Sequence, residues 1–268
     1  MLSLMNNPAR SSVSQSACYE QPLNERVRAL LRLEFLFHQV DHALDGCSTW
    51  SSRAALQGLF DILALTGRDD LKRGLLKELE RFAAILKRLR HVPTVHVAMV
   101  DSVLAEIATS TEQIHHLDTL ALNALRQNAF LSAINKRNQS PGGTCRFDLP
   151  AFHYWLQQDA LDRDKDLRQW LAPFDPLQGA VELILRTIRE SAEFQPKIAA
   201  KGFFQQSLDL SAPNQLIRVL LSRQDTVFPE ISGGKHRFTI RFLKQPDPNQ
   251  RATQSETDVA FKLACCAI

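Results

Sequence analysis

Two histidines lie four residues apart in a segment with helical periodicity, a spacing that can place both imidazoles against one metal ion. His38 and His42 follow Glu34 at intervals of one helical turn, and imidazole and carboxylate groups are frequent zinc ligands. The sequence has no HExxH pattern here, so the spacing favours a polar stripe on a mostly buried helix. A metal-dependent enzyme built on His38 and His42 is the competing hypothesis, which elemental analysis of the purified protein tests.

Other candidate catalytic patterns are incomplete. Gly233-Gly234-Lys235 resembles the end of a phosphate-binding loop, but the first glycine of that motif is missing and a strand pattern follows where a helix is required. We interpret it as a hairpin turn. The sequence also lacks a GxSxG motif and a plausible Cys/His nucleophile pair. We therefore expect a protein without catalytic activity and without a cofactor.

A basic segment runs from residue 68 to residue 90. This segment contains eight cationic side chains and four carboxylates. Arg73, Lys77 and Arg81 share one helical face. Considered alone, such a run is most simply a solvated helix surface. The cations are Arg68, Lys72, Arg73, Lys77, Arg81, Lys87, Arg88 and Arg90.

Two further pairs of arginines support a binding hypothesis. Arg237 and Arg241 lie on the outward side of an alternating strand pattern, and Arg28 and Arg32 are one turn apart on the first expected helix. If folding brings these side chains together, they form one cationic groove for an acidic or mixed-charge protein partner. The alternative is a nucleic-acid-binding protein that uses the same basic patches, which a salt-dependent shift of labelled DNA or RNA would reveal.

The composition is that of an ordinary globular protein. Hydrophobic residues make up 44% and charged residues 23% of the 268 positions, and the formal net charge is +3. This charge is too mild to demand nucleic acid. The five cysteines are odd in number and mostly far apart, which predicts reduced thiols in the cytosol. No segment resembles a signal-peptide core or a membrane span of about 18 apolar residues, so we expect neither export nor membrane insertion.

The first two thirds of the chain has helical periodicity. The segment from Asn24 to Leu44 predicts a helix that is buried on several faces and capped by Asn24. Further helices are predicted at residues 54–65, 69–90, 95–108, 120–136 and 161–171, and one more from Asp175. The segment 69–90 has a heptad-like seam, suited to packing within the chain or in a dimer, that consists of Leu75, Leu79, Phe82, Leu86 and Leu89. The last helix has a buried stripe that consists of Leu177, Val181, Ile184 and Ile188.

After residue 192 the period changes to two, which indicates strands. We predict an α+β fold, in which a mainly helical domain packs with a small antiparallel β-sheet domain. The expected divisions are a disordered N-terminal extension at 1–18, a helical domain at 19–192 and an antiparallel β domain at 193–268. Residues 228–234 and 245–257 are expected to be turn-like, and a strand is expected around 202–210. The inward-facing sets are Phe238, Ile240 and Phe242, then Ile217, Val219 and Leu221, then Val259, Phe261, Leu263 and Cys265.

Several separate motifs, in order along residues 19–266, resemble the ZapD family of cell-division proteins. The Ser-rich N-terminal extension lies outside the resemblance. The motifs are Pro22-Leu23-Asn24-Glu25, Leu31-Arg32-Leu33-Glu34-Phe35-Leu36, Leu75-Leu76-Lys77-Glu78-Leu79, Pro141-Gly142-Gly143, Phe147-Asp148-Leu149-Pro150 with His153, Trp155 and Leu156, Ile188-Arg189 with Ser191-Ala192, Gly202-Phe203, Pro229 with Ile231-Ser232-Gly233, Arg237-Phe238 with Ile240-Arg241-Phe242, and Leu263-Ala264-Cys265-Cys266.

The resemblance implies a helical domain plus a β domain, assembled as a cytoplasmic homodimer at the mid-cell division site. It implies binding to the tubulin-like protein FtsZ, through the FtsZ C-terminal tail, and crosslinking of FtsZ filaments into bundles that stabilise the Z-ring during septation. It also implies a basic binding surface. The matching positions are Arg32, Arg68, His153, Arg237 and Arg241.

One arginine of the family pattern has no counterpart at the matching position. The chain has Ala129 there, and Arg126 is expected about one helical turn away as a substitute. Arginine suits a flexible acidic tail because its guanidinium pairs with carboxylates, while its stem and neighbouring aromatic rings cover apolar side chains. Phe203 and Trp155 are the rings expected in that role.

Overall fold

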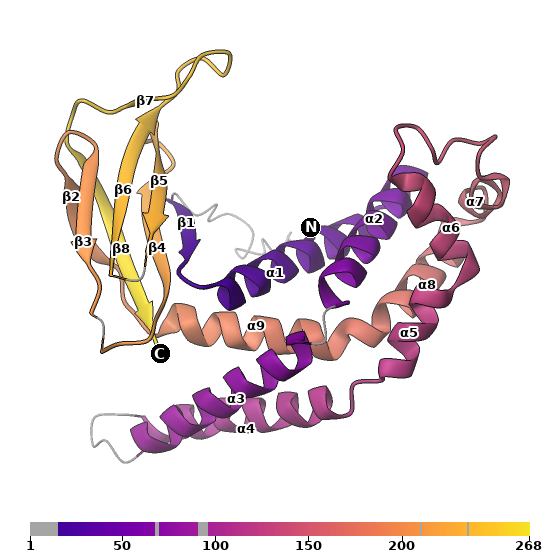
Figure 1. Cartoon of the computed structure of the whole chain (residues 1–268), viewed down its shortest axis with the longest axis horizontal. Helices are drawn as coiled ribbons and strands as arrows, with labels where there is room; N and C mark the ends of the chain where they lie inside the picture. Colours follow the sequence, from indigo (N-terminus) through magenta and orange to yellow (C-terminus); the bar gives the residue numbers. More distant parts are fainter. Residues whose placement is uncertain (1–15, 68–69, 91–95, 210, 235) are drawn as a thin grey trace, which may run out of the picture. The chain divides into compact units, whose positions relative to one another are not determined.

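The chain folds as two units that divide at residues 28 and 186. In this computed structural model the described residues are 16–67, 70–90, 96–209, 211–234 and 236–268 (Figure 1). The helical unit is Ala29–Arg186, and the β unit combines residues 16–28 with Thr187–Ile268. The predicted α+β class is confirmed.

Helices form where apolar residues recur with helical spacing. Asn24 caps the first helix as predicted, because its Oδ1 accepts a hydrogen bond from the Val27 backbone N–H at 2.9 Å. The stripe predicted in the last helix is buried throughout. The helices are α1 (Glu25–Leu44), α2 (Thr49–Thr66), α3 (Asp70–Leu89), α4 (Val97–His115), α5 (Thr119–Gln127), α6 (Ala129–Asn138), α7 (Pro150–Leu156), α8 (Ala160–Leu171) and α9 (Asp175–Glu190), with the 3-10 turn η2 (Ala172–Phe174) before α9.

The heptad-like seam of α3 packs inside the helical unit. Leu75, Leu79 and Phe82 are almost completely buried, and α3 lies along α4 (Figure 1). Leu89, the last residue of the seam, is 39% exposed. Of the two roles predicted for the seam, packing within the chain therefore accounts for its buried part.

The helix predicted at residues 120–136 is wrong as one element, because the chain breaks it at Asn128. The Asn128 backbone N–H ends α5 with a hydrogen bond to the Leu125 carbonyl at 3.2 Å. Its side chain then caps α6 by accepting from the Leu131 N–H at 3.0 Å. Arg126 and Ala129 thus belong to different helices and are not one turn apart on a single helix.

Arg163 is a charged side chain buried in the helical unit. It is 6% exposed, and its Nε donates to Ser52 Oγ at 3.1 Å. Its Nη1 donates to the carbonyls of Leu156, at 3.3 Å, and Gln158, and its Nη2 donates to the Cys47 carbonyl at 2.9 Å. One arginine on α8 therefore ties together the start of α2, the end of α7 and the segment that precedes α2.

The β unit contains two antiparallel sheets, where the sequence led us to expect one. One sheet has the order β1-β4-β8-β2 and the other β3-β6-β5, with β7 paired to β6. Strand alternation identifies buried faces but not which strands pair, so the second sheet could not be inferred. The strands are β1 (Ser16–Pro22), β2 (Gln195–Ala199), β3 (Phe203–Ser207), β4 (Asn214–Ser222), β5 (Val227–Gly233), β6 (Arg237–Lys244), β7 (Thr253–Gln254) and β8 (Val259–Ala267).

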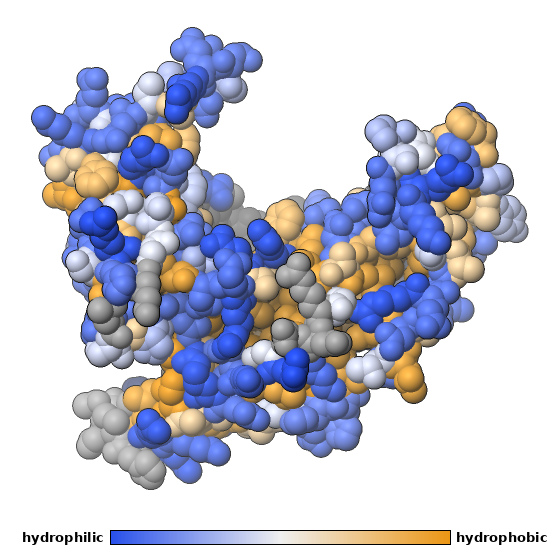
Figure 2. Space-filling model, in the orientation of Figure 1, coloured by the Kyte–Doolittle hydropathy of each residue, from blue (hydrophilic) through white to orange (hydrophobic). Residues whose placement is uncertain are grey.

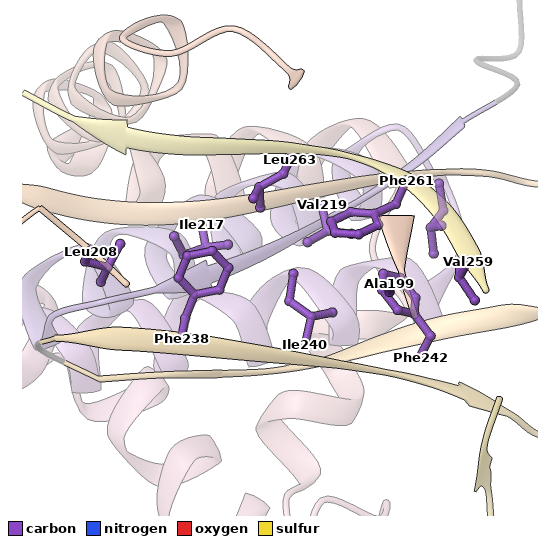
Figure 3. Close-up of a cluster of buried hydrophobic side chains, with 11 residues drawn as sticks. Ala199, Leu208, Ile217, Val219, Phe238, Ile240, Phe242, Val259, Phe261 and Leu263 are labelled. Carbon is purple, nitrogen blue, oxygen red and sulfur yellow. The ribbon is translucent and has the colours of Figure 1, made fainter. Parts of the chain in front are cut away.

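The core of the β unit lies between the two sheets (Figure 3). Phe238, Ile240 and Phe242 of β6 point into it from one layer, as predicted, and the apolar side chains of β4 and β8 point into it from the other. Burial of aromatic and aliphatic side chains on both inner faces stabilises a sandwich of this kind. The outward positions of β6 are consequently fixed as a solvent-facing row.

Residues 228–234, expected to be a turn, mostly form the strand β5. Its Pro229 is compatible with a strand because β5 is the edge strand of its sheet, where a missing N–H is tolerated. The predicted hairpin turn follows at Gly234, whose N–H donates to the Arg237 carbonyl at 3.0 Å. Lys235, the next residue of that motif, lies outside the described residues.

The strand β1 begins within the segment expected to be a disordered extension. It pairs with β4 from Ser16 opposite Ser222 to Pro22 opposite Leu216. Glu20 of β1 forms ion pairs with Arg189, at 2.7 Å, and Arg218, at 2.9 Å. These half-buried contacts join residues that are far apart in the sequence and place residues 16–22 in the β unit.

The helices and the thiols bear on two of the expectations from the sequence. Every helix in the described part of the chain is too short or too polar to cross a lipid bilayer. Burial raises the pKa of the Cys266 thiol to about 11, and burial also raises the pKa of Cys265. The adjacent cysteines of the C-terminal motif are therefore poor nucleophiles near neutral pH.

Candidate functional site

The outer face of the sheet β3-β6-β5, which we call the sheet-B face, carries the two arginines predicted on β6. Arg237 and Arg241 are exposed, whereas Phe238, Ile240 and Phe242 between and beside them are buried. The register of the neighbouring strands determines what surrounds the arginines. Phe203 and Glu230 lie directly opposite Arg241, Ser207 lies opposite Arg237, and Gln205 and Ser232 lie opposite Thr239.

The two arginines of the sheet-B face differ in their ion pairs. Arg241 forms an ion pair with Glu230, and more than half of each of these side chains is exposed. Such exposed pairs contribute about 0–1 kcal/mol, so an incoming carboxylate can replace Glu230 at little cost. Within the described residues, no ion pair engages Arg237. An acidic peptide would thus find two guanidinium groups on one strand.

The apolar contribution to this face comes from Phe203. It is 43% exposed, and the preceding Gly202 has a φ of +69°. A Cβ at Gly202 would lie 2.7 Å from the Ser255 carbonyl oxygen, so this position requires glycine. The Gly202-Phe203 motif therefore makes the tight turn that aligns Phe203 with Arg241.

Trp155, the other ring expected to contact a ligand, is buried, and that expectation is wrong. Its ring stacks on Phe152 with centroids 6.0 Å apart, and its Nε1–H donates to Asp166 Oδ2 at 2.8 Å. A tryptophan at the i+3 position from an aromatic residue fits a helical core as well as a binding surface. The sequence alone did not distinguish the two.

In the helical unit, the predicted site residues lie on separate helices. Arg32 is exposed on α1, Arg126 is exposed on α5, and His153 is half-buried on α7. Arg126 donates to Asn123 Oδ1 at 3.1 Å. Arg68 lies outside the described residues. Because these residues belong to one unit, and Arg237 and Arg241 to the other, their convergence into one groove stays a prediction.

The basic face predicted on α3 is partly used for internal contacts. Arg81 forms an ion pair with the buried Glu78 at 2.6 Å. Its guanidinium also lies 4.6 Å from the centroid of the Phe82 ring. Arg73 and Lys77 are exposed. Arg81 therefore belongs to the packing of α3, and its role in a binding face is not supported.

The Pro141-Gly142-Gly143 motif shapes the segment that leads into α7. A Cβ at Gly143 would approach the Arg137 carbonyl oxygen to 2.2 Å, so only glycine permits this close passage of the backbone. The Cys145 thiol donates to Asp148 Oδ2 at 3.1 Å, and Pro150 occupies the first turn of α7. The motif thus has a structural role in positioning α7.

The structure offers no donor set for the metal hypothesis. His38 and His42 are both exposed on α1. Among the residues that the structure describes, no three histidine, cysteine, aspartate or glutamate side chains lie close enough together to hold a metal ion. The exposed, mixed cationic and aromatic surface is chemically suited to binding a flexible acidic segment.

Comparison with known proteins agrees with the motifs of the sequence. The family model of ZapD, described as a cell division protein, matches residues 31–241. The cell division protein ZapD of Methylococcus capsulatus is 40% identical over 251 residues, which cover 93% of this chain and 98% of that protein. The ZapD of Coxiella burnetii is 37% identical over 257 residues, 96% of this chain and 100% of that protein. The ZapD of Chromobacterium violaceum is 39% identical over 248 residues, which cover 92% of this chain and 98% of that protein.

The family match extends into both the helical unit and the β unit, and it includes Arg237 and Arg241. The relatives are named for a role in cell division, not for a catalysed reaction. The chain belongs to the ZapD family of cell division proteins.

Proposed function

We propose that this protein binds the C-terminal tail of FtsZ and crosslinks FtsZ filaments as a homodimer. The sheet-B face carries the proposal, because it presents both Arg237 and Arg241, and the exposed ring of Phe203 stands in register opposite Arg241. Guanidinium groups pair with the carboxylates of a flexible tail, and the arginine stems and the phenyl ring cover its apolar side chains. In this proposal Arg32, Arg68, Arg126 and His153 contribute further contacts to the tail from the helical unit.

Bundling follows from two equal binding sites in one assembly. A two-fold dimer presents the same surface twice. Once one site holds a filament, the other meets a second filament at a high effective concentration, so individually modest contacts produce bundles. A monomeric variant is expected to bind filaments without bundling them. The proposed location is the cytoplasmic side of the division site at mid-cell, where the FtsZ ring assembles.

Co-sedimentation with FtsZ filaments tests this function. We expect the protein to pellet with full-length FtsZ and to remain in the supernatant with FtsZ that lacks its C-terminal tail. Because exposed ion pairs are screened over about 8 Å at physiological ionic strength, the pelleted fraction is expected to fall as salt rises. FtsZ polymerisation in each reaction is checked by light scattering.

Unchanged pelleting with tail-deleted FtsZ would show that the tail is not the ligand. A particle that stays monomeric in multi-angle light scattering at every concentration would contradict the bivalent mechanism. The two parts of the proposal, tail binding and crosslinking, are thus tested separately.

A further inference from the structure

Trp50 is an exposed tryptophan whose ring is contacted by an arginine side chain. It is the second residue of α2 and is 76% exposed, although tryptophan side chains are largely buried on average. The Arg53 guanidinium, one helical turn further along α2, lies 5.5 Å from the centroid of the Trp50 ring. A cation placed over an aromatic ring in this way holds the ring by cation–π attraction.

Arg53 is itself fixed by contacts to the segment that precedes α7. Its Nη1 donates to Thr144 Oγ1 at 3.0 Å and its Nη2 to the Thr144 carbonyl at 3.3 Å. Its guanidinium also lies 4.7 Å from the centroid of the buried Phe152 ring, which stacks on Trp155. The exposed Trp50 therefore stands at the end of a column of stacked groups, and binding a ligand there orders few additional side chains.

A second exposed ring and further cations lie on or beside the segment that precedes α7. Phe147 is 84% exposed and follows Thr144, the partner of Arg53, by only three residues. Figure 2 shows hydrophobic side chains beside strongly hydrophilic ones at the end of the helical unit that holds α6 and α7. Arg146 is exposed, and Asp148 is already engaged by Arg137, at 3.9 Å, and by the Cys145 thiol.

The net positive charge around Trp50 and Phe147 favours an acidic ligand. The first two turns of α2 and residues 136–153 carry four permanently cationic side chains and one carboxylate. Large exposed apolar groups next to arginine are typical of interface hot spots, in which tryptophan and arginine are over-represented. The cations are Arg53, Lys136, Arg137 and Arg146, and the carboxylate is Asp148.

We infer that Trp50 and Phe147, with Arg53 and Arg146 around them, form a second anchor site for an acidic peptide segment that carries an aromatic or large aliphatic side chain. The apolar side chain of the ligand packs on the Trp50 ring, and its carboxylates pair with Arg146. This inference rests on the proposed function, in which the segment belongs to the FtsZ tail. It assigns to α2 and the segment before α7 a contact that neither the family match nor the basic residues alone indicate.

The test is a titration of a fluorescein-labelled peptide, the FtsZ C-terminal tail, with the full chain, followed by fluorescence anisotropy. Removal of a hot-spot ring weakens binding by about tenfold to thirtyfold, so we expect this loss for Trp50→Ala. Trp50→Phe keeps a ring and is expected to stay within about threefold of the wild type. Leu120→Ala, which shortens a 78% exposed side chain on α5, is the control with no expected change.

Tryptophan emission gives an independent readout. Trp50 is exposed, whereas Trp155 is buried and Trp170 is half-buried. Acrylamide should therefore quench mainly Trp50 in the free protein, and the tail peptide should protect it. In Trp50→Phe the protectable emission should disappear while the peptide still binds.

The outcomes separate the two proposals. Equal tail affinity of the wild type and Trp50→Ala, with unchanged thermal unfolding, would overturn this inference and leave tail binding intact. Absence of tail binding to the wild type at micromolar protein would overturn the proposed function and this inference with it. A loss in Trp50→Ala that Trp50→Phe restores supports the inference.

Discussion

Replacing Arg163 by leucine is expected to lower the free energy of unfolding of the helical unit by about 3 kcal/mol or more. The guanidinium of Arg163 satisfies Ser52 Oγ and three backbone carbonyls inside the unit. Leucine leaves these acceptors without their donor, and buried polar groups without partners are destabilising. For a unit of this size, the expected decrease in the melting temperature is roughly 6–12 °C, which differential scanning calorimetry measures.

A matched substitution on the same helix isolates the effect of burial. Lys165→Leu also removes a cation from α8, but Lys165 is exposed, so we expect a change within about 0.5 kcal/mol. Arg163→Lys keeps the charge, but lysine has only one nitrogen to replace the three that contact several segments. The melting temperature of this variant should therefore lie between those of Arg163→Leu and Lys165→Leu. If Arg163→Leu and Lys165→Leu melted at the same temperature, the buried hydrogen bonds would not stabilise the unit.

Reversing the charge of both Arg237 and Arg241 is expected to abolish FtsZ bundling. Each change to glutamate converts an attraction for a carboxylate into a repulsion, so tail affinity should fall by about a hundredfold or more. Both side chains are exposed on the sheet-B face and none of the core between the sheets is altered. Arg241→Glu places a carboxylate opposite Glu230, which is expected to cost about 1 kcal/mol at most. Turbidity and pelleting of FtsZ filaments measure the loss.

Two exposed arginines elsewhere in the β unit provide the control. Arg223→Glu with Arg251→Glu changes the net charge by the same amount, and both positions are exposed outside β6. The control variant should bundle filaments nearly as well as the wild type. Equal loss in both double variants would mean that net charge, not the sheet-B face, governs binding.

The elements with one strong periodic signal could be predicted from the sequence. The buried stripes of α3 and α9 and the alternation in β6 follow directly from where apolar residues recur, because packing against a core requires that spacing. The cap at Asn24 could be predicted because a short polar side chain there meets the free N–H groups of a helix.

Other features depend on pairing partners that no local pattern contains. The strand β1 ends in proline, and it is held by pairing with β4 and by the contacts of Glu20 with Arg189 and Arg218. The break at Asn128 depends on one side chain that caps the following helix. Pro229 indicates a turn locally, yet an edge strand accepts it.

The candidate site was predictable only in part for the same reason. Alternation placed Arg237 and Arg241 on the outward side of β6, but the presence of Glu230 beside Arg241 follows from the register of β5. Burial distinguishes Phe203, which is available to a ligand, from Trp155, which is not. The hydrogen bond between Arg53 and Thr144, which holds Arg53 beside Trp50, joins residues 91 positions apart and left no signal in the sequence.

Photo-crosslinking of the FtsZ tail peptide tests most directly whether the sheet-B face is the docking surface. A photoreactive phenylalanine is placed at Gln205, which lies on that face opposite Thr239, or at Lys262, which is exposed on β8 of the other sheet. We predict a crosslink to the tail from position 205 that disappears at high salt, and no crosslink from position 262. Crosslinking from position 262 alone, or from neither position under conditions in which the tail binds, would contradict the account.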